Sequence, residues 1–435
     1  MTGKEKMLLC VASLFCALGS AVAWDMGDPI VTYWAGPGFR GNPERLTMRA
    51  AKQLKDGGFN TVWATSPQEL DVAAAFGLRV IYDLRVGRRL PDSAESREKL
   101  AARIAEVRNH PALYLYRHWD EPSAVMFDEL ARMKAFFKKH DPVHPTWVNL
   151  LPTYANNKQL GIDGDLIRAY WEHVRLFGEV YHPEMVSHDH YQFTVGGDTW
   201  QYFLNLGIIR QSAAAQDIPF MNGVQACTWV PGDSASPSSP RIPGPDEMAF
   251  LVYTTVAYGA QGIYYYVYSY PGHRGSIADL DGTTGDKYEA LKTLNREFVA
   301  IAKEIRRARF VGAYFQGRHA PGTTPYCPQA ILRISPDVPT TECSPGKDMA
   351  NTILVTRFDV DGRPSHFMVV NLDYRQERTV SVSAPASLER FDPIAGTWHR
   401  IGQTADVCMG RGRGVLLRLG SPNCQVSPGW WVDNN

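Results

Sequence analysis

The sequence has none of the features that are typical of nucleic-acid-binding, membrane-spanning or zinc proteins. Its 435 residues include 45 basic and 45 acidic side chains, so the formal net charge is zero. This balance argues against nucleic acid as a main partner. Beyond the N-terminal segment, no apolar run is long enough to span a membrane. No CxxC or HExxH spacing occurs, and we predict neither a metal site nor a cofactor.

Cysteine is also scarce, with seven residues in the chain. Cys10 and Cys16 lie in the N-terminal segment, and Cys227 is expected to be a small buried apolar residue. The other four fall in the last third of the chain, and they are Cys327, Cys343, Cys408 and Cys424. Four cysteines allow three pairings, and the sequence does not choose among them. The simplest pairing joins the first with the second and the third with the fourth, and export would permit both disulfides.

The N-terminus has the pattern of an export signal. Lys4 and Lys6 form a charged start, residues 7–18 an apolar stretch, and residues 21–23 a small-residue cleavage site. The apolar stretch is too short for a membrane span. We therefore predict a signal peptide over residues 1–23. The mature protein would begin near Trp24 and would be secreted or periplasmic, with no membrane attachment after cleavage.

Strand and helix patterns alternate regularly over residues 24–308. The predicted strands are residues 30–35, 59–64, 78–84, the start of 112–122, 146–151, 185–193, 219–229 and 262–268. These runs are apolar or aromatic throughout, as expected for strands that are buried on both faces. Eight such strands with intervening helices predict an α/β fold, a (β/α)8 or TIM barrel. The alternative is an open doubly wound sheet, but no GxGxxG turn follows the first strand.

The pattern changes over residues 309–435. Short strand-like runs at 330–334, 352–358, 366–370, 379–382 and 414–417 are separated by Gly, Pro, Asp and Ser, and no helical period is present. This pattern predicts a small all-β sandwich domain. The segment contains no cluster of catalytic residue types. We expect it to pack against the barrel, with carbohydrate binding as the alternative role.

Residues 112–122, ALYLYRHWDEP, are the most informative stretch of the chain. A buried strand leads directly into two adjacent carboxylates, Asp120 and Glu121. Pro122 is then expected to start an amphipathic helix, because proline suits the first helical turn. The two acids would therefore lie at the carboxyl end of a strand, where parallel α/β proteins carry out their chemistry. The alternative is that they only cap the helix.

Functional side chains of such a barrel come from the carboxyl ends of its strands. We predict Asp120, Glu121 and Asp189 as catalytic residues. The predicted substrate-binding residues are Tyr33, Trp34, Trp63, Asp83, His118, Trp119, Asn149, His188, His190, Tyr191, Gln225, Trp229 and Tyr266.

Carboxylates beside aromatic and amide side chains suit glycoside hydrolysis, which needs two carboxyl groups that flank the scissile bond. Aromatic rings would hold the sugar, and Asn149 and Gln225 could bind its hydroxyl groups. The partner expected from this set is a carbohydrate substrate. His188 and His190 could suggest a metal site, but two histidines without a third ligand are more often hydrogen-bonded site residues.

At this point the chain resembles a known family. The acid pair followed by proline is similar to the Asn-Glu-Pro motif of the clan A (β/α)8 glycoside hydrolases. Residues 258–266, YGAQGIYYY, resemble the end of bacterial β-galactosidase-like barrels. Residues 369–372, VVNL, and 414–419, GVLLRL, resemble the β-sandwich that follows such barrels. The resemblance implies that Glu121 is the general acid/base and that the reaction retains the anomeric configuration.

Two positions depart from that family. Asp120 stands where the clan has Asn, and the seventh strand, PFMNGVQACTW, ends in Gln225 without the clan's glutamate nucleophile. Asp189 on the sixth strand is the best substitute by position. The alternative is that Asp189 only orients His188 or Tyr191. Weaker candidates for the second acid are Asp83, Asp233 and Glu247.

Two other functions remain open from the sequence. A barrel without the strand-seven acid could bind glycans without cleaving them. A polysaccharide lyase could instead use His188, His190 and Tyr191 as base and acid. The sequence leaves open the sugar, the linkage, internal or terminal cleavage, retention or inversion, and the oligomeric state.

Overall fold

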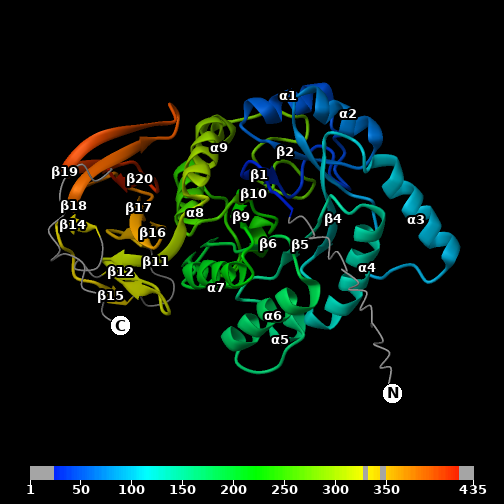
Figure 1. Ribbon diagram of the computed structural model, residues 1–435, viewed down its shortest axis with the longest axis horizontal. Helices are drawn as coiled ribbons and strands as arrows, with labels where there is room; N and C mark the ends of the chain where they lie inside the picture. The colour runs from blue at the N-terminus through cyan, green and yellow to red at the C-terminus, as the bar shows by residue number, and fades with distance from the viewer. Residues whose placement is uncertain (1–23, 327–331, 343–348, 421–435) are drawn as a thin grey trace, which may run out of the picture.

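The computed structural model describes residues 24–326, 332–342 and 349–420. It confirms the predicted fold: a parallel barrel surrounded by helices is followed by a curled, mostly antiparallel sheet (Figure 1). No helix within the described ranges is long and apolar enough to cross a membrane.

Eight parallel strands build the barrel. They are β1 (Ile30–Tyr33), β2 (Thr61–Ala64), β3 (Arg79–Tyr82), β4 (Leu113–Asp120), β5 (Thr146–Leu150), β6 (Val186–Asp189), β9 (Phe220–Gln225) and β10 (Gly262–Tyr266). Their spatial order is β1-β10-β9-β6-β5-β4-β3-β2. Asn60 closes the circle between β1 and β2: its N–H donates to the Val31 carbonyl (3.2 Å), and its Oδ1 accepts from the Val31 N–H (3.0 Å).

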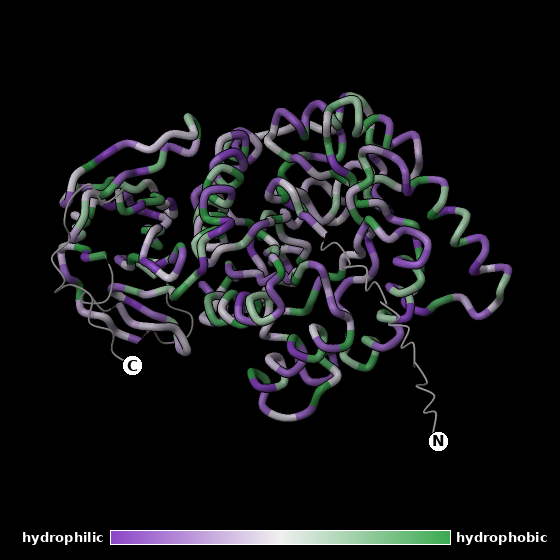
Figure 2. The backbone as a smooth tube through the Cα atoms, viewed as in Figure 1, coloured by the Kyte–Doolittle hydropathy of each residue, from purple (hydrophilic) through white to green (hydrophobic). Residues whose placement is uncertain are grey.

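Helices follow the strands around the outside of the barrel. They are α1 (Met48–Asp56), α2 (Pro67–Ala75), α3 (Ala94–Val107), α4 (Phe127–His140), α5 (Asn157–Leu160), α6 (Leu166–Tyr181), α7 (Tyr202–Ala215), α8 (Pro245–Ala257) and α9 (Asp286–Ile305). Hydrophobic and hydrophilic segments alternate along the outer helices, as one buried and one wet face require (Figure 2). Helix α8 is buried on almost all sides, because it lies between the barrel and the C-terminal sheet.

The predicted helix start at Pro122 is wrong. A short 3-10 turn, η1 (Ala124–Met126), precedes α4, which begins at Phe127. Glu121 has a positive φ of 47°, and Ser123 is extended. The chain therefore forms a short loop after β4, and the two acids do not belong to the first turn of a helix.

The C-terminal strands are β11 (Arg309–Gln316), β12 (Arg318–His319), β13 (Thr324–Pro325), β14 (Arg333–Ser335), β15 (Thr341–Glu342), β16 (Ile353–Val360), β17 (Arg363–Asn371), β18 (Arg378–Asp392), β19 (Thr397–Met409) and β20 (Gly414–Leu419). One sheet has the order β13-β11-β16-β17-β20-β18-β14, and β19 pairs with β18. The sequence did not predict β19, whose residues are mostly polar and solvent-facing.

The two parts share a hydrophobic core. Phe315 and Phe358 from the C-terminal sheet belong to the same buried cluster as the barrel residues. The ring of Phe203 on α7 lies edge-on to Phe315, with centroids 4.9 Å apart. Arg413 also forms an ion pair with Glu297 on α9 at 2.7 Å. The C-terminal part therefore packs against the barrel through both apolar and charged contacts.

The disulfide prediction finds no support. Cys408 is a free, exposed thiol on β19, and Cys227 is free and buried as expected. Cys327, Cys343 and Cys424 lie outside the described residues, as does the predicted signal peptide.

Candidate active site

Asp120 faces the inside of the barrel because β4 contains a bulge. Residues that pair in register on neighbouring parallel strands face the same side of the sheet. Arg117 pairs with Trp147, and Asp120 pairs with Asn149. Trp147 and Asn149 are two positions apart on β5, whereas Arg117 and Asp120 are three positions apart on β4. The register shift between Arg117 and Trp119 accounts for the extra residue. A regular strand would turn Asp120 outward.

The side chain of Glu121 is oriented differently, by a left-handed backbone conformation at this residue. Its φ of 47° costs a non-glycine residue about 1–2 kcal/mol. Its N–H donates to the carbonyl of Asn149 at 2.8 Å, which ties the turn to β5. Glu121 is exposed at the mouth of the barrel and lines a cavity of about 630 Å³. Backbone strain of this kind is concentrated at functional sites.

Asn149 lies between the carboxyl groups of two strands. Its Nδ2 is 3.5 Å from Asp120 Oδ1 and 3.4 Å from Asp189 Oδ1. Its Oδ1 accepts from Ser187 Oγ at 2.9 Å and from Tyr264 OH at 3.0 Å. These two donors fix the orientation of the amide, so that its N–H groups face the acids. Asn149 therefore links the carboxyl groups of Asp120 and Asp189.

Asp189 lies on β6 and is almost fully buried. Its Oδ2 accepts from Tyr191 OH at 2.7 Å. The neighbouring position on β9 is Gly223, where a Cβ would lie 2.6 Å from the Tyr264 hydroxyl oxygen and 2.7 Å from Asp189 Cβ. Only glycine leaves room there for both side chains.

The environment makes all three acids harder to ionise. Loss of solvation and the Asp189 charge raise the pKa of Asp120 to about 7, against an opposing effect of Arg117. Burial raises the pKa of Asp189 to about 6, although hydrogen bonds from Tyr191 and Asn149 lower it. Although Glu121 is exposed as a residue, partial loss of solvation at its carboxyl group raises its pKa as well, and the charges of Asp189 and Asp120 add to the shift. Glu121 is thus the group best suited to remain protonated at neutral pH.

The cavity beside Glu121 has a strongly aromatic wall. Its aromatic residues are Tyr154, Tyr191, Trp200 and Trp229, and its other lining residues are Leu151, Pro152, Ala155, Gln159, Thr194, Thr199, Gln201, Ser238 and Pro240. Tyr191 and Trp229 have ring centroids 4.8 Å apart, and Tyr266 supports both at 5.1 Å. The volume lies within the ~300–1,000 Å³ range of small-molecule sites.

Several predicted site residues point away from this mouth. His118 Nδ1 pairs with Tyr181 OH on α6 (3.0 Å), and His190 pairs with Asn205 on α7 (3.0 Å). His188 is fully buried and pairs in register with Leu150, on the outer side of the sheet. Burial lowers the pKa of all three imidazoles, to about 3 for His118 and His188 and about 4 for His190. They therefore lie between the barrel and its helices, and they do not contact the cavity.

Other predicted binding residues have structural roles. Trp34 and Trp63 pack with Trp147 inside the barrel, with centroid distances of 5.3 and 5.6 Å to Trp147. Tyr33 faces the outer layer, where its hydroxyl donates to the Pro37 carbonyl (2.7 Å). These aromatic residues were predicted from their place at strand ends, but they fill the core.

Gln225 and Asp83, the remaining polar residues that were predicted to bind substrate, form hydrogen bonds with the backbone or an ion pair. Gln225 donates to the Phe193 and Arg241 carbonyls at 2.8 Å each and accepts from the Phe193 N–H at 2.9 Å. Asp83 accepts from the Arg85 N–H (2.6 Å) and pairs with Arg40 (3.7 Å).

Trp119 is also displaced from the mouth. It pairs in register with Val148, between the inward-facing Trp147 and Asn149, and is half-buried on the outer side of the sheet. Of the predicted binding residues, Tyr191 and Trp229 line the cavity, whereas Asn149 and Tyr266 support it from behind.

Sequence reasoning missed several cavity residues. Tyr154, Gln159, Trp200 and Gln201 lie in or beside loops after β5 and β6, some way beyond the strand ends. An aromatic residue in a loop that follows a barrel strand is the signal that indicates such a position, and Tyr154, which is 44% exposed, is an example. Gly223 and Ser187 carry no sequence signal, because their role depends on neighbouring strands.

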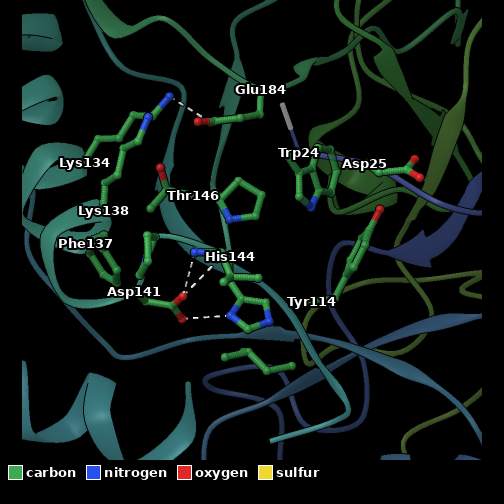
Figure 3. Close-up of a pocket in the computed structure, with 14 residues that line it drawn as sticks. Trp24, Asp25, Tyr114, Lys134, Phe137, Lys138, Asp141, His144, Thr146 and Glu184 are labelled. Carbon is green, nitrogen blue, oxygen red and sulfur yellow. Dashed lines mark hydrogen bonds and ion pairs between the residues drawn. The ribbon is translucent and has the colours of Figure 1, made fainter. Parts of the chain in front are cut away.

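A second large cavity, about 710 Å³, lies at the opposite end of the barrel (Figure 3). It is lined by the first residues of β4 and β5, together with Trp24 and α4. Lys134 pairs there with Glu184 at 2.7 Å, and Asp141 with His144 at 2.8 Å. These charges satisfy one another, and the amino-terminal end of such barrels generally serves stability. The Glu121 end is therefore the candidate active site.

Within the ranges that the structure describes, no group of three or more His, Cys, Asp and Glu side chains is arranged to hold a metal ion. Asp120 is instead held by Asn149 and Arg117, and Asp189 by Asn149 and Tyr191.

Comparisons with protein-family models and with curated proteins found no match. Solved structures with a similar fold include glycoside hydrolases. A β-galactosidase from the psychrophilic Marinomonas ef1 is 9% identical with a TM-score of 0.46, and the match covers 66% of this chain and 63% of that one. A family 5 glycoside hydrolase from Bacteroides vulgatus is 13% identical with a TM-score of 0.48, covering 92% of each chain. A family 27 β-L-arabinopyranosidase from Geobacillus stearothermophilus is 10% identical with a TM-score of 0.42, covering 91% and 85%.

Proposed function

We propose that this protein hydrolyses glycosidic bonds at the carboxyl end of its barrel, with Glu121 as proton donor and Asp189 as the second carboxylate. The observation that carries the proposal is the set of three acids from β4 and β6 beside an aromatic-lined cavity. Glycoside hydrolysis needs one protonated and one ionised carboxyl group on opposite sides of the bond.

The different environments of the two acids support this division of roles. Glu121 is exposed to the cavity, and its raised pKa keeps it protonated, as a general acid must be. Asp189 accepts hydrogen bonds from Tyr191 and Asn149, which favour its ionised form. Asp120 and Asp189 each approach the same Asn149 nitrogen, so this amide joins the acids of β4 and β6 in one site.

A lyase that uses His188 and His190 has no support from the geometry. Both imidazoles are buried away from the cavity, and Tyr191 already donates its hydroxyl to Asp189. Export remains part of the proposal, supported by the pattern of residues 1–23.

Glu121→Gln tests the role of the proton donor. The amide keeps the shape of the side chain but cannot deliver a proton, so turnover of unactivated glycans should fall by ~10²–10⁴-fold. Aryl glycosides with good leaving groups should lose less, because they need little protonation. The measurement is kcat on both substrate types, with circular dichroism to verify folding. Near-normal turnover of an unactivated glycan by this variant would reject the assignment.

Asp189→Asn tests the second carboxylate. Turnover should be abolished whether Asp189 acts as nucleophile or activates water. Azide added to this variant should yield a glycosyl azide of inverted configuration only if Asp189 is the nucleophile. Proton NMR of the first product of the wild-type enzyme distinguishes retention from inversion. Activity within a few-fold of wild type would place the second carboxylate elsewhere, and Asp120 would be examined next. Binding of glycans without any turnover by the wild-type protein would instead identify an inactive glycan-binding barrel.

A further inference from the structure

We infer that the cavity beside Glu121 accepts uncharged glycans and discriminates against sugars that carry carboxylate or sulfate groups. This inference rests on the proposed carbohydrate role of the same cavity and adds the charge class of its substrate.

The lining of the cavity is the first observation. Among the described residues that line the cavity, Glu121 is the only one with an acidic or basic side chain. The polar groups that remain are amides and hydroxyls, from Gln159, Gln201, Ser238 and two threonines. Neutral groups of this kind match the hydroxyl groups of an uncharged sugar. An anionic sugar would need a guanidinium or ammonium group to replace its lost hydration.

The acids beneath the cavity are the second observation. Asp120 and Asp189 lie within hydrogen-bonding range of the same Asn149 nitrogen, and both interact electrostatically with Glu121. A substrate anion near Glu121 would therefore approach the ionised carboxylate of Asp189, which is the acid of the three with the lowest pKa, in a site of low polarity. Juxtaposed like charges are a common means of rejecting the wrong ligand.

Two cations near this end of the barrel are engaged elsewhere, which is the third observation. Arg117 is buried, with its guanidinium 5.9 Å from the Trp34 ring centroid, and interacts with Asp120 beneath the mouth. Arg241 forms an ion pair with Glu247 on α8. Neither residue lines the cavity.

The test compares matched neutral and acidic probes. Cellotetraose, xylotetraose, mannotetraose and β-1,4-galactotetraose would be titrated against Glu121→Gln at pH 6.5, so that hydrolysis does not consume them. The C6-oxidised uronic acid forms of the three hexose probes, which differ from them only by carboxylates, would be titrated in parallel by calorimetry. At least one neutral probe should bind, and its oxidised form should bind at least ~10-fold more weakly. Equal or tighter binding of the oxidised form, or no binding by any neutral probe, would overturn the inference.

Two variants and one control variant locate the effect. Trp200→Ala should weaken binding of the neutral probe by ~3- to 10-fold, whereas Trp171→Ala, an exposed tryptophan on α6 outside this cavity, should not. Ser238→Arg adds a cation at the rim, so the affinity ratio of oxidised to neutral probe should rise at least ~3-fold. An unchanged ratio would show that charge is not the cause of discrimination.

Wild-type hydrolysis, measured on the same probes, separates this inference from the proposed function. Binding of a neutral probe without cleavage would reject the hydrolase and leave the charge preference intact. Cleavage of an oxidised probe at a rate similar to its neutral form would support the hydrolase and overturn the charge preference.

Discussion

Asp189 shows how a single buried acid can lower the stability of the folded protein. Its ionised form is buried, which raises its pKa to about 6, whereas an unfolded aspartate titrates near ~3.9. The folded state therefore binds the proton more tightly than the unfolded state. Stability is highest below the unfolded pKa and is lost as the pH rises through about 6.

Replacement of this acid should consequently stabilise the protein above neutral pH. Asp189→Asn is expected to keep the Tyr191 contact and to remove the buried charge. The free energy of unfolding of Asp189→Asn, measured relative to that of the wild type, should increase by about 1–3 kcal/mol between pH 4 and pH 8. Urea unfolding at both pH values measures it. Asp359→Asn is the control, because Asp359 is a buried aspartate paired with Arg357 (2.8 Å), and its loss should destabilise at pH 8. An Asp189→Asn variant that is less stable than wild type at pH 8 would contradict this account.

Asn149 should act through the pH dependence of the reaction. Its hydrogen bonds lower the pKa values of Asp189 and Asp120, so Asn149→Ala should raise both and move the acidic limb of the kcat/KM profile to higher pH. The loss of kcat/KM should be roughly three- to tenfold greater at pH 5 than at pH 8. Asn222→Ala is the matched control, because Asn222 donates outward to Thr255 on α8 (2.7 Å). A parallel loss at both pH values would indicate a purely structural role for Asn149.

At the scale of the elements, the mouth depends on irregularities in two strands. The bulge in β4 turns Asp120 inward, and Gly223 in β9 leaves space for Asp189 and Tyr264. Neither feature would matter in an isolated strand. Each is defined by what the adjacent strands place beside it.

Gly223→Ala tests the space in β9. The added Cβ would meet Tyr264 at 2.6 Å and Asp189 at 2.7 Å, so both side chains must move. A displacement of about 1 Å in a catalytic group lowers turnover by ~10²-fold. Kinetics and thermal unfolding measure the effect. In Gly207→Ala on α7, the Cβ meets nothing within 4 Å, and this variant should gain up to about 1 kcal/mol of stability with activity unchanged. Full activity in Gly223→Ala would show that the placement of Asp189 and Tyr264 does not depend on this glycine.

At the scale of the whole molecule, the C-terminal sheet supports one wall of the cavity. Tyr374, which follows β17, donates to Asp198 at 3.1 Å in the hairpin of β7 (Phe193–Thr194) and β8 (Gly197–Asp198). Its ring also lies 5.4 Å from that of Phe193. The same hairpin leads to Thr199 and Trp200, which line the cavity. We therefore expect the sheet to influence substrate binding through the hairpin.

Tyr374→Phe should change binding more than chemistry. It removes the hydroxyl that holds Asp198 and keeps the ring, so KM should rise by roughly three- to tenfold, in line with ~1 kcal/mol for the hydrogen bond, while kcat stays within twofold. The pH profile should not move, because no acid at the mouth is touched. Tyr314→Phe, on β11 in the C-terminal sheet, is the control. A fall in kcat with KM unchanged would refute the supporting role.

The sequence alone determined the architecture of this protein. Eight apolar strands alternate with amphipathic helices, and this order has few solutions other than a closed parallel barrel, because buried parallel strands need helices on their outer face. The position of Asp120, Glu121 and Asp189 at strand ends also followed from the sequence, since the ends of the predicted strands were correct to within a few residues. Five of the C-terminal strands followed from the sequence, namely β14, β16, β17, β18 and β20, whereas β11, the polar β19 and the two-residue strands β12, β13 and β15 did not.

Only the tertiary structure decided which strand-end side chains meet at the mouth. Alternation along a strand fixes that neighbours face opposite sides, but a single bulge reverses the assignment, as it does for Asp120. His188 and His190 face the helices, and Trp34 and Trp63 fill the barrel, because register and packing set their direction. The long loops add Tyr154 and Trp200 to the cavity from outside the strands. Residue type and order thus specify the edge of the barrel that carries the candidate site, whereas contacts between strands that are distant in sequence specify which residues form it.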